Sequence, residues 1–561
     1  MQNATTDIGR VDVIIIIGYI ILIVGYGCFV GIRHRNKVES SSYFLAGNTL
    51  SWPLIGLALF STNISTIHLV SLAQEGYKNG LAYGNFEWMA AFILIVLALF
   101  FVPFYFRARI STLPDFLEKR YDSRCRDWLA ILSIFSAIII HIGFSLYTGA
   151  VVLEGIFGIE QQVLSISVLG VEFSVSARML IITTTAVLTG LYTIIGGLLA
   201  VVVTESIQTV ILILGAVCIT LIGLHRVGGW EGIAANVEPV KLTVLRTADD
   251  PSNLPWYSIF LGYPILGIWY WCADQTIVQR VLGAKTEKDA RLGPLLTGFM
   301  KILPIFIFVL PGTICLALIN QGAIPPLSDA LDGADTYAHL IKTILPVGVK
   351  GLVAAALLAA LMSTVSGALN SISTLVSYDI YQRWRPETPQ KKLILVGRLV
   401  TFLGMVLAIL WSPLIAHYRS IFQGINMIIS YIAPPVTTVF LFGIFWRKAS
   451  TKGALATLYL GSVLGAIVFF IDWFKEAPWM AWLDFQIPFL LMSFYLFIAC
   501  SMIIIIVSLF YPQQHTIESE KLIWAHPLEA VMGKGEKQSQ RYILIAGLLF
   551  VTMIAFYIIF A

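Results

Sequence analysis

Long apolar runs separated by short polar segments dominate the chain. Runs such as 12–31 and 82–106 are mostly Leu, Ile, Val and Phe. Each is close to the roughly 20 residues that a helix needs to cross a bilayer, and the pattern predicts about 14 such helices. Their expected positions are 12–31, 51–76, 82–106, 128–156, 178–195, 198–224, 256–273, 293–320, 347–377, 394–414, 420–445, 454–473, 485–510 and 542–560.

The composition supports an all-α integral membrane protein. Of the 561 residues, 58% are hydrophobic and 12% are charged, whereas charged residues approach about a quarter of a soluble domain. The 6 cysteines are scattered and lack metal-ligand spacing, so we expect neither a zinc site nor a disulfide framework. No phosphate-binding glycine loop is present, which disfavours transport driven by ATP.

Basic residues indicate the orientation. The loops that carry most of them are 32–37, 107–127, 279–291, 381–392, 447–452 and 511–541. With the N-terminus outside, all of these loops face the cytoplasm and hold roughly 25 of the 36 Lys and Arg. We therefore expect a plasma or inner membrane protein with both termini on the outer side, and the polar 511–541 loop inside.

The stretch 61–71 interrupts the second apolar run with the sequence STNISTIHLVS. Such residues hydrogen-bond their own backbone and favour a break in the helix. A broken helix is tolerated at membrane depth only where it lines a cavity. The alternative is that the hydroxyls pack between helices, but Asn63 and His68 exceed what packing requires.

Two further ionisable residues lie inside apolar runs and are candidates for a functional site. Glu87 is about one turn inside its run, and Lys301 is about nine residues into another. A buried carboxylate or ammonium needs a partner, and His68 is a plausible neighbour of Glu87. Alternatively, Glu87 reaches the headgroups and Lys301 extends to the inner interface.

An aromatic cluster stands in the segment 265–280. Trp269, Tyr270 and Trp271 present faces on which the C–H surface of a sugar stacks, followed by Asp274 and Gln275. The alternative is an aromatic belt at the membrane interface.

Small and hydroxyl residues recur at helical spacing in 356–379. They are Ser363, Thr364, Ser366, Asn370 and Ser373. Hydroxyls and free carbonyls suit a hard monovalent cation, although a close helix–helix interface of small residues has the same pattern.

Together these segments predict a site at the membrane midplane, formed by broken helices near the second and seventh spans. Interrupted segments at corresponding places in two halves are typical of secondary transporters with inverted repeats. We expect one transmembrane domain over 1–561, with repeats at 51–224 and 256–445. The helices at 12–31 and within 454–560 are then peripheral, one before and three after a five-plus-five repeat.

Several motifs carry a family resemblance. They are NIS followed by His68, GLAYGNFEW, YTIIGGLLAVVVTESIQ, WYWCADQTIVQR, LPVGVKGLVAAALLAALMSTVSGALNSISTLVSYDIY and APPVTTVFLFGIFWRKASTKGA. Over roughly 12–455 the chain resembles the sodium/solute symporter family, in its sodium–glucose cotransporter branch. The resemblance implies a LeuT-like fold, Na⁺-coupled uptake and alternating access.

The resemblance also implies roles for single residues. A sodium site would use backbone oxygens of Ser61, Ile64 and Ala360 with the hydroxyls of Ser363 and Thr364. The residues implied in sugar binding are Asn63, His68, Glu87, Lys301 and Asn426, with Tyr270 as an inner aromatic gate and Trp271 beside it.

Four positions depart from the family pattern. Asn426 replaces a Gln, Ala90 a Ser, and Gly267 a polar residue, so a hexose, an inositol or an amino sugar remains open. Glu205 replaces the Asp of a possible second sodium site, and we expect one Na⁺ per substrate.

The sequence thus predicts a Na⁺-coupled importer of a neutral sugar or polyol, acting as a monomer without an organic cofactor and without nucleic acid. Three alternatives stay open: a sugar sensor of the same fold, a carrier of another small solute, and a membrane enzyme. The enzyme is disfavoured because no paired acidic residues or metal ligands gather at one interface.

Overall fold

The computed structural model describes residues 8–33, 40–159, 162–168, 171–250, 252–327, 333, 335–417, 421–474, 487–513, 515–524 and 537–561. Part of the expected 511–541 loop, and the first residues of the spans expected at 420–445 and 485–510, lie outside the described residues.

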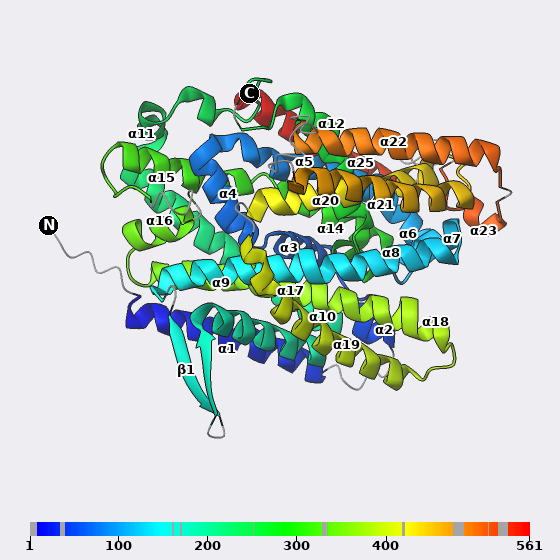
Figure 1. Ribbon diagram of the computed structural model, residues 1–561, viewed down its shortest axis with the longest axis horizontal. Coiled ribbons are helices and arrows are strands. Elements are labelled where there is room, and N and C mark those ends of the chain that lie inside the picture. Colours follow the sequence, from blue (N-terminus) through cyan, green and yellow to red (C-terminus); the bar gives the residue numbers. More distant parts are fainter. Residues whose placement is uncertain are drawn as a thin grey trace.

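Helices form almost all of the described chain (Figure 1). The first group is α1 (Arg10–Arg33), α2 (Ser40–Phe44), α3 (Trp52–Asn63), α4 (Thr66–Asn79), α5 (Asn85–Val96), α6 (Val102–Ala108), α7 (Leu113–Arg120), α8 (Ser123–Ser136) and α9 (Phe144–Phe157). The middle group is α10 (Ala177–Val227), α11 (Gly229–Asn236), α12 (Trp256–Ile268), α13 (Gln275–Leu282), α14 (Glu287–Met300), α15 (Leu310–Asn320), α16 (Thr336–Ile344) and α17 (Val349–Leu375). The last group is α18 (Gln382–Trp384), α19 (Gln390–Trp411), α20 (Ile421–Phe445), α21 (Thr451–Phe474), α22 (Phe489–Phe510), α23 (Ile517–Glu520) and α25 (Lys537–Ile559).

Short π-helical and 3₁₀ segments join many of these helices. The π-helical segments are η3 (Leu97–Phe101), η4 (Ala137–Gly143), η6 (Trp269–Ala273), η7 (Ile305–Val309) and η9 (Val376–Tyr381). The 3₁₀ segments are η1 (Ala46–Asn48), η2 (Gly80–Gly84), η5 (Pro239–Leu242) and η10 (Ser412–His417). Single π-turns inside helices are frequent at functional sites.

The helix break expected in 61–71 is present. α3 ends at Asn63 and α4 begins at Thr66, with Ile64 and Ser65 in extended conformation between them. A second break follows η6, where Asp274 is extended before α13. The two spans in which broken helices were expected, the second and the seventh, are therefore discontinuous.

A third interruption was not expected. The run at 293–320 is divided into α14 and η7–α15, which are bent by 40°. Lys301 lies at this bend, directly after Met300, and Pro304 precedes η7. Proline cannot donate a helical hydrogen bond, which accounts for the interruption.

The spans expected at 178–195 and 198–224 form one element, α10, with a kink at Gly197. Gly197 has φ +58°, and a Cβ there would lie 2.4 Å from the carbonyl oxygen of Tyr43. Only glycine fits this conformation and this close approach. The two predicted helices are thus distinct in direction but continuous in sequence.

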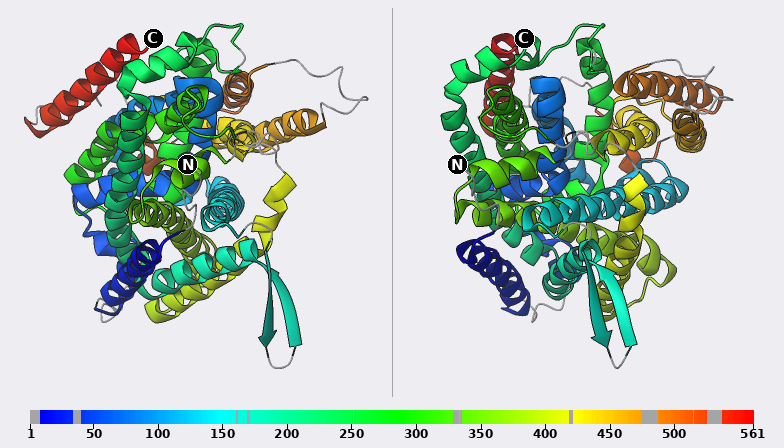
Figure 2. Two further views of the ribbon diagram at one scale, coloured as in Figure 1. Left: turned by 90° about the vertical axis from the view of Figure 1, so that its left-hand side faces the viewer. Right: turned by 60° about the vertical axis from the view of Figure 1, so that its left-hand side comes forward.

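The expectation of an all-α protein is wrong at one place. Strands β1 (Val163–Val168) and β2 (Val171–Ser176) pair antiparallel, with Val163 opposite Ser176. The hairpin projects away from the helices (Figure 2). Apolar and polar residues alternate over 164–168 and 171–176, which is the period of a β-strand.

Apolar side chains cover the outside of the bundle. Ile14, Ile21, Leu544 and Val551 are more than 60% exposed on the peripheral helices α1 and α25. Arg280, Glu205 and Lys301 are instead fully buried. This inverted arrangement is the one expected in lipid, where ionisable groups face the interior.

The described residues contain 10 helices long and apolar enough to cross a membrane, or up to 11 if the bent pair is one span. Among the helix pairs, α10 and α17 make extensive contact, and α3 packs on α14. α17 runs through the interior of the bundle, and its residues 353–375 are all buried. Of the discontinuous helices, α3, α4 and α13 contact it.

Candidate functional site

A buried pocket lies where the discontinuous helices meet. All seven residues expected to contact a substrate line it. They are Asn63, His68, Glu87, Tyr270, Trp271, Lys301 and Asn426. We call this cavity the central pocket. Thr364 of α17 also lines it, so the hydroxyl-rich helix reaches the same cavity.

The break between α3 and α4 orients His68. Its Nδ1 accepts a hydrogen bond from the backbone N–H of Ser65 at 3.3 Å. An imidazole nitrogen that accepts leaves the proton on the other nitrogen. Nε2–H is thereby directed at the Glu87 carboxylate, 3.7 Å away.

Lys301 and Glu87 form a buried ion pair inside the pocket. The Lys301 ammonium donates to the carboxylate of Glu87 and to the side-chain oxygen of Asn63. The exposed fractions of the two charged side chains are 1% and 3%. The alternatives in which these residues reach the membrane interfaces are therefore wrong.

Aromatic rings enclose the ammonium. Lys301 Nζ lies 5.3 Å from the centre of the Trp271 ring and 5.7 Å from that of Phe60. Trp271 is 1% exposed, so it is not part of an interfacial belt. Rings at this distance attract a cation through their π electrons. They add to the ion pair that fixes Lys301 at the pocket wall.

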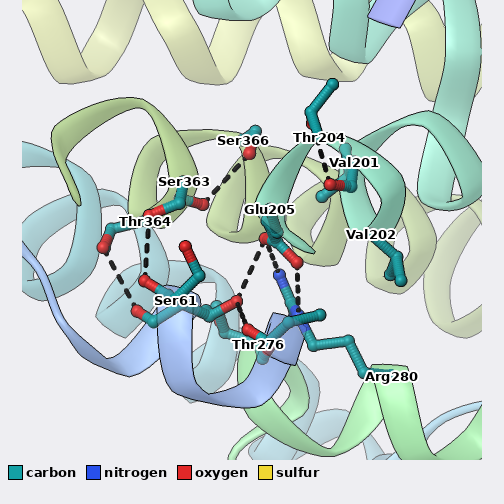
Figure 3. A network of polar contacts seen from close by, with 12 residues as sticks. Ser61, Val201, Val202, Thr204, Glu205, Thr276, Arg280, Ser363, Thr364 and Ser366 are labelled. Atoms are coloured by element: carbon teal, nitrogen blue, oxygen red, sulfur yellow. Dashed lines mark hydrogen bonds and ion pairs between the residues drawn. The ribbon is translucent and has the colours of Figure 1, made fainter. Parts of the chain in front are cut away.

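The hydroxyls of α17 bond to the end of α3, as Figure 3 shows. Ser363 Oγ donates to the Ser61 carbonyl at 2.9 Å, and Thr364 Oγ1 donates to the Thr62 carbonyl at 3.1 Å. Both hydroxyls also lie within 3.2 Å of the Ala360 carbonyl. The Ser61 and Thr62 carbonyls can accept these bonds because they lie in the last turn of α3, where carbonyls lack an intrahelical partner.

Four of the five residues expected at a sodium site thus gather at one place. Ile64 lies at the break itself, with an extended backbone. Among the described contacts, Thr364 bonds to the carbonyl of Thr62 rather than to that of Ile64. Ser61 Oγ is buried and has no hydrogen-bond partner among the described residues.

Glu205 is held in a second buried ion pair (Figure 3). Its carboxylate oxygens lie 2.5 and 3.1 Å from Arg280 nitrogens, and it accepts from Thr62 Oγ1 at 3.0 Å. Both charged side chains are 0% exposed. A Cβ on Gly367 would lie 2.2 Å from Arg280 Nη2, so the pair requires a glycine on α17.

Sequence reasoning missed several of these relationships. The partner of Glu205 is 75 residues away, and nothing in the local pattern identifies it. His141 also lines the pocket, 3.3 Å from Asp274. An isolated His in the apolar stretch AIIIHIG is an intramembrane ionisable residue and was therefore a detectable signal.

A helical membrane protein whose pocket holds buried polar residues between discontinuous helices belongs to the class of secondary transporters by its architecture. The family model of the sodium:solute symporter family matches residues 43–461. The chain belongs to this family.

The curated relatives include sugar carriers. Sodium/glucose cotransporter 4 of Danio rerio is 34% identical over 495 residues, which is 83% of this chain and 73% of the relative. The sodium/myo-inositol cotransporter of Mus musculus is 32% identical, covering 89% and 73%. The sodium/mannose cotransporter of Bos taurus is 33% identical, covering 97% and 95%.

A solved structure has the same fold. A Na⁺-coupled sialic acid symporter aligns with a TM-score of 0.74, covering 91% of this chain and 100% of that one. The sequence identity is 22%, so this likeness concerns the fold.

Proposed function

We propose that this protein is a Na⁺-coupled symporter that imports a neutral sugar or polyol by alternating access. The observation that carries the proposal is the buried Lys301–Glu87 ion pair inside a pocket that Thr364 of α17 also lines. A pocket with cancelled charge and many hydrogen-bond groups suits an uncharged polyhydroxyl compound. The sugar and inositol carriers among the relatives support this class of substrate.

In this proposal the pocket residues have two roles, hydrogen bonding and ring stacking. Asn63, His68, Glu87, Lys301 and Asn426 exchange hydrogen bonds with substrate hydroxyls. The Tyr270 ring stacks on the apolar face of the substrate and acts as the inner gate, with Trp271 beside it. Tyr270 and Trp271 lie in η6, directly before a helix break, so their rings move with that segment.

The proposed Na⁺ site combines the Ser363 and Thr364 hydroxyls with backbone oxygens of Ser61, Ile64 and Ala360. The buried, unpartnered Ser61 Oγ and the Ser61 and Thr62 carbonyls, which accept bonds from the hydroxyls of α17, support it. Oxygen ligands without a carboxylate suit a monovalent hard cation. Na⁺ would replace the two hydroxyl-to-carbonyl bonds by ion–oxygen contacts.

We propose a stoichiometry of one Na⁺ per substrate. Glu205, the candidate for a second ion, is paired with Arg280 at 2.5 Å. A second cation at Glu205 would have to displace the guanidinium from a buried site, which leaves a buried charge unpaired.

Coupling follows from the shared break. Na⁺ bound between α3 and α17 orders the break between α3 and α4, and Asn63 and His68 lie on either side of this break. The ion therefore raises the affinity for the substrate. Thermodynamic linkage requires that the substrate raise the affinity for Na⁺ by the same factor. The mechanism requires neither covalent chemistry nor an organic cofactor nor nucleic acid.

The membrane arrangement completes the proposal. Fourteen spans result when α3–α4, α12–α13 and α14–α15 each count as one and α10 counts as two. The repeats at 51–224 and 256–445 then each begin with a broken helix. Both termini face outward, the protein acts as a monomer, and the basic loops face the cytoplasm.

Stabilisation by ligands tests this function in purified protein. We expect glucose, galactose or myo-inositol to raise the thermal unfolding midpoint in NaCl but not in choline chloride, because a ligand that binds the native state stabilises it. Stabilisation by an anionic or cationic solute, with no response to neutral polyols in NaCl, would reject the proposed substrate class.

A further inference from the structure

A second pair of ionisable side chains lies beside the central pocket. His141 of η4 and Asp274, at the break between η6 and α13, approach to 3.3 Å between Nε2 and Oδ2. Their side chains are 5% and 3% exposed. The proposed binding of Na⁺ and substrate makes no use of this pair.

Asp274 bonds in two directions. Its Oδ1 accepts from the backbone N–H of Thr276 at 2.7 Å and so caps the N-terminus of α13. Its Oδ2 faces His141 on a different helix. Because the Asp274 backbone is extended, with φ −88° and ψ 124°, the carboxylate anchors a point where the chain is not helical.

His141 also contacts the pocket side of this break. The centre of its ring lies 5.9 Å from that of Tyr270, and both residues line the pocket. Cys272, Ala273 and Asp274 are buried and do not line the pocket. The pocket lining thus stops at Trp271, and the buried residues 272–274 follow directly after it.

We propose that His141 is a positioning residue whose bond to Asp274 holds η6 and the start of α13 against η4. On the proposed transport function, this bond must break before the substrate leaves on the α13 side. Beside the ring contact of His141 with Tyr270, this bond ties the segment to η4, and the other hydrogen bonds of η6 and α13 go to other elements. They include the Tyr105 hydroxyl to the Cys272 carbonyl, the Leu113 N–H to Gln275, Gln279 to Phe44 and Thr374, and Arg280 to Glu205.

A native cysteine reports on the movement. Cys272 lies in the segment and is 0% exposed, and Cys500 on another helix, α22, is also 0% exposed. Alkylation by N-ethylmaleimide in proteoliposomes, followed by mass spectrometry of each cysteine peptide, compares the two sites in the same molecule. Cys500 serves as the control for general loosening.

The variants separate bonding from packing. His141→Leu removes the donor, whereas His141→Gln retains an N–H group that reaches a carboxylate. We expect His141→Leu to increase the alkylation rate of Cys272 by about tenfold while Cys500 changes less than about twofold, the result of a shifted opening equilibrium. His141→Gln should remain within about threefold of the parent protein.

Asp274→Asn provides a second variant that keeps an oxygen for the Thr276 N–H. It should also expose Cys272, and in transport it should change the turnover rate more than the KM. Unchanged Cys272 alkylation in both His141→Leu and Asp274→Asn would overturn the proposal, as would equal acceleration at Cys500. The alkylation does not require transport, so a parent protein without Na⁺-dependent uptake rejects the proposed function and leaves this test readable.

Discussion

The Lys301 ammonium donates to the Glu87 carboxylate inside the central pocket, although the two residues are 214 positions apart in the sequence. The side chains are almost completely buried, so each charge depends on the other. Removing one partner of such a pair leaves an uncompensated charge, which costs about 3–5 kcal/mol. The pair therefore sets both the shape and the net charge of the site.

Glu87→Gln should abolish tight binding of a neutral substrate. The Lys301 charge would remain in the pocket without its counterion, and we expect an affinity loss of about 100-fold or more, equivalent to about 2.8 kcal/mol. Equilibrium binding of the polyol identified by thermal stabilisation, measured in NaCl, checks this.

A matched control is Glu154→Gln. The Glu154 side chain is 2% exposed, against 3% for Glu87, and bonds to Arg178 at 2.7 Å, but it is outside the pocket. Its substrate affinity should stay within about threefold of the parent protein. Equal losses in the two variants would contradict a specific role for the Lys301–Glu87 pair.

Ser363→Ala should weaken the response to Na⁺. The substitution removes one oxygen that faces the Ser61 carbonyl, and we expect the half-saturating Na⁺ concentration to rise by about tenfold or more. Substrate uptake as a function of Na⁺ concentration measures this. Ser366→Ala is the control, because Ser366 Oγ bonds to the Ser363 carbonyl within its own helix. A similar Na⁺ response in parent and Ser363→Ala proteins would remove Ser363 from the site.

Arg280→Met should mainly lower the stability of the protein, and its direct effect on the central pocket should be smaller. It leaves the Glu205 carboxylate buried without a counterion, at a cost of about 3–5 kcal/mol. We expect a lower thermal unfolding midpoint in detergent, and partial recovery in the double variant Arg280→Met, Glu205→Leu. A double variant less stable than Arg280→Met alone would show that the charges are not coupled in this way.

Gly197→Ala should destabilise the kink in α10. The new Cβ meets the Tyr43 carbonyl at 2.4 Å in a left-handed backbone conformation. We expect a loss of about 2 kcal/mol or more, seen as a lower unfolding midpoint and reduced yield of monodisperse protein. Gly547→Ala in α25 meets no atom within 4 Å and should be neutral. Normal stability of Gly197→Ala would contradict the observed kink.

The sequence predicted the pocket better than it predicted the contacts within it. Polar residues in apolar runs are costly in lipid, so Asn63, His68, Glu87 and Lys301 stood out wherever they lay. The break after Asn63 followed from the same composition. These four line one cavity together with Tyr270, Trp271 and Asn426, and Asn426 was expected from the family resemblance alone.

The buried ion pairs could not be predicted from the sequence because their partners are far apart in the chain. Glu205 could be noticed, but Arg280 on another helix could not be assigned to it from spacing. The bend at Lys301 was missed because the run 293–320 was interpreted as one span, although Pro304 was visible in it. The hairpin at 163–176 was missed although its alternating pattern was visible, because helical spans dominated the interpretation.

The most direct test is uphill uptake in proteoliposomes. With an inward Na⁺ gradient and an interior at −100 mV, the voltage alone supplies about 2.3 kcal/mol for each Na⁺ that enters. An energy of about 1.4 kcal/mol corresponds to tenfold accumulation of the substrate. Radiolabelled glucose, galactose or myo-inositol should therefore exceed its external concentration by about tenfold or more, and replacement of Na⁺ by choline should abolish the effect. Equilibration without accumulation, or accumulation that persists in choline, would contradict a Na⁺-coupled symporter of neutral polyols.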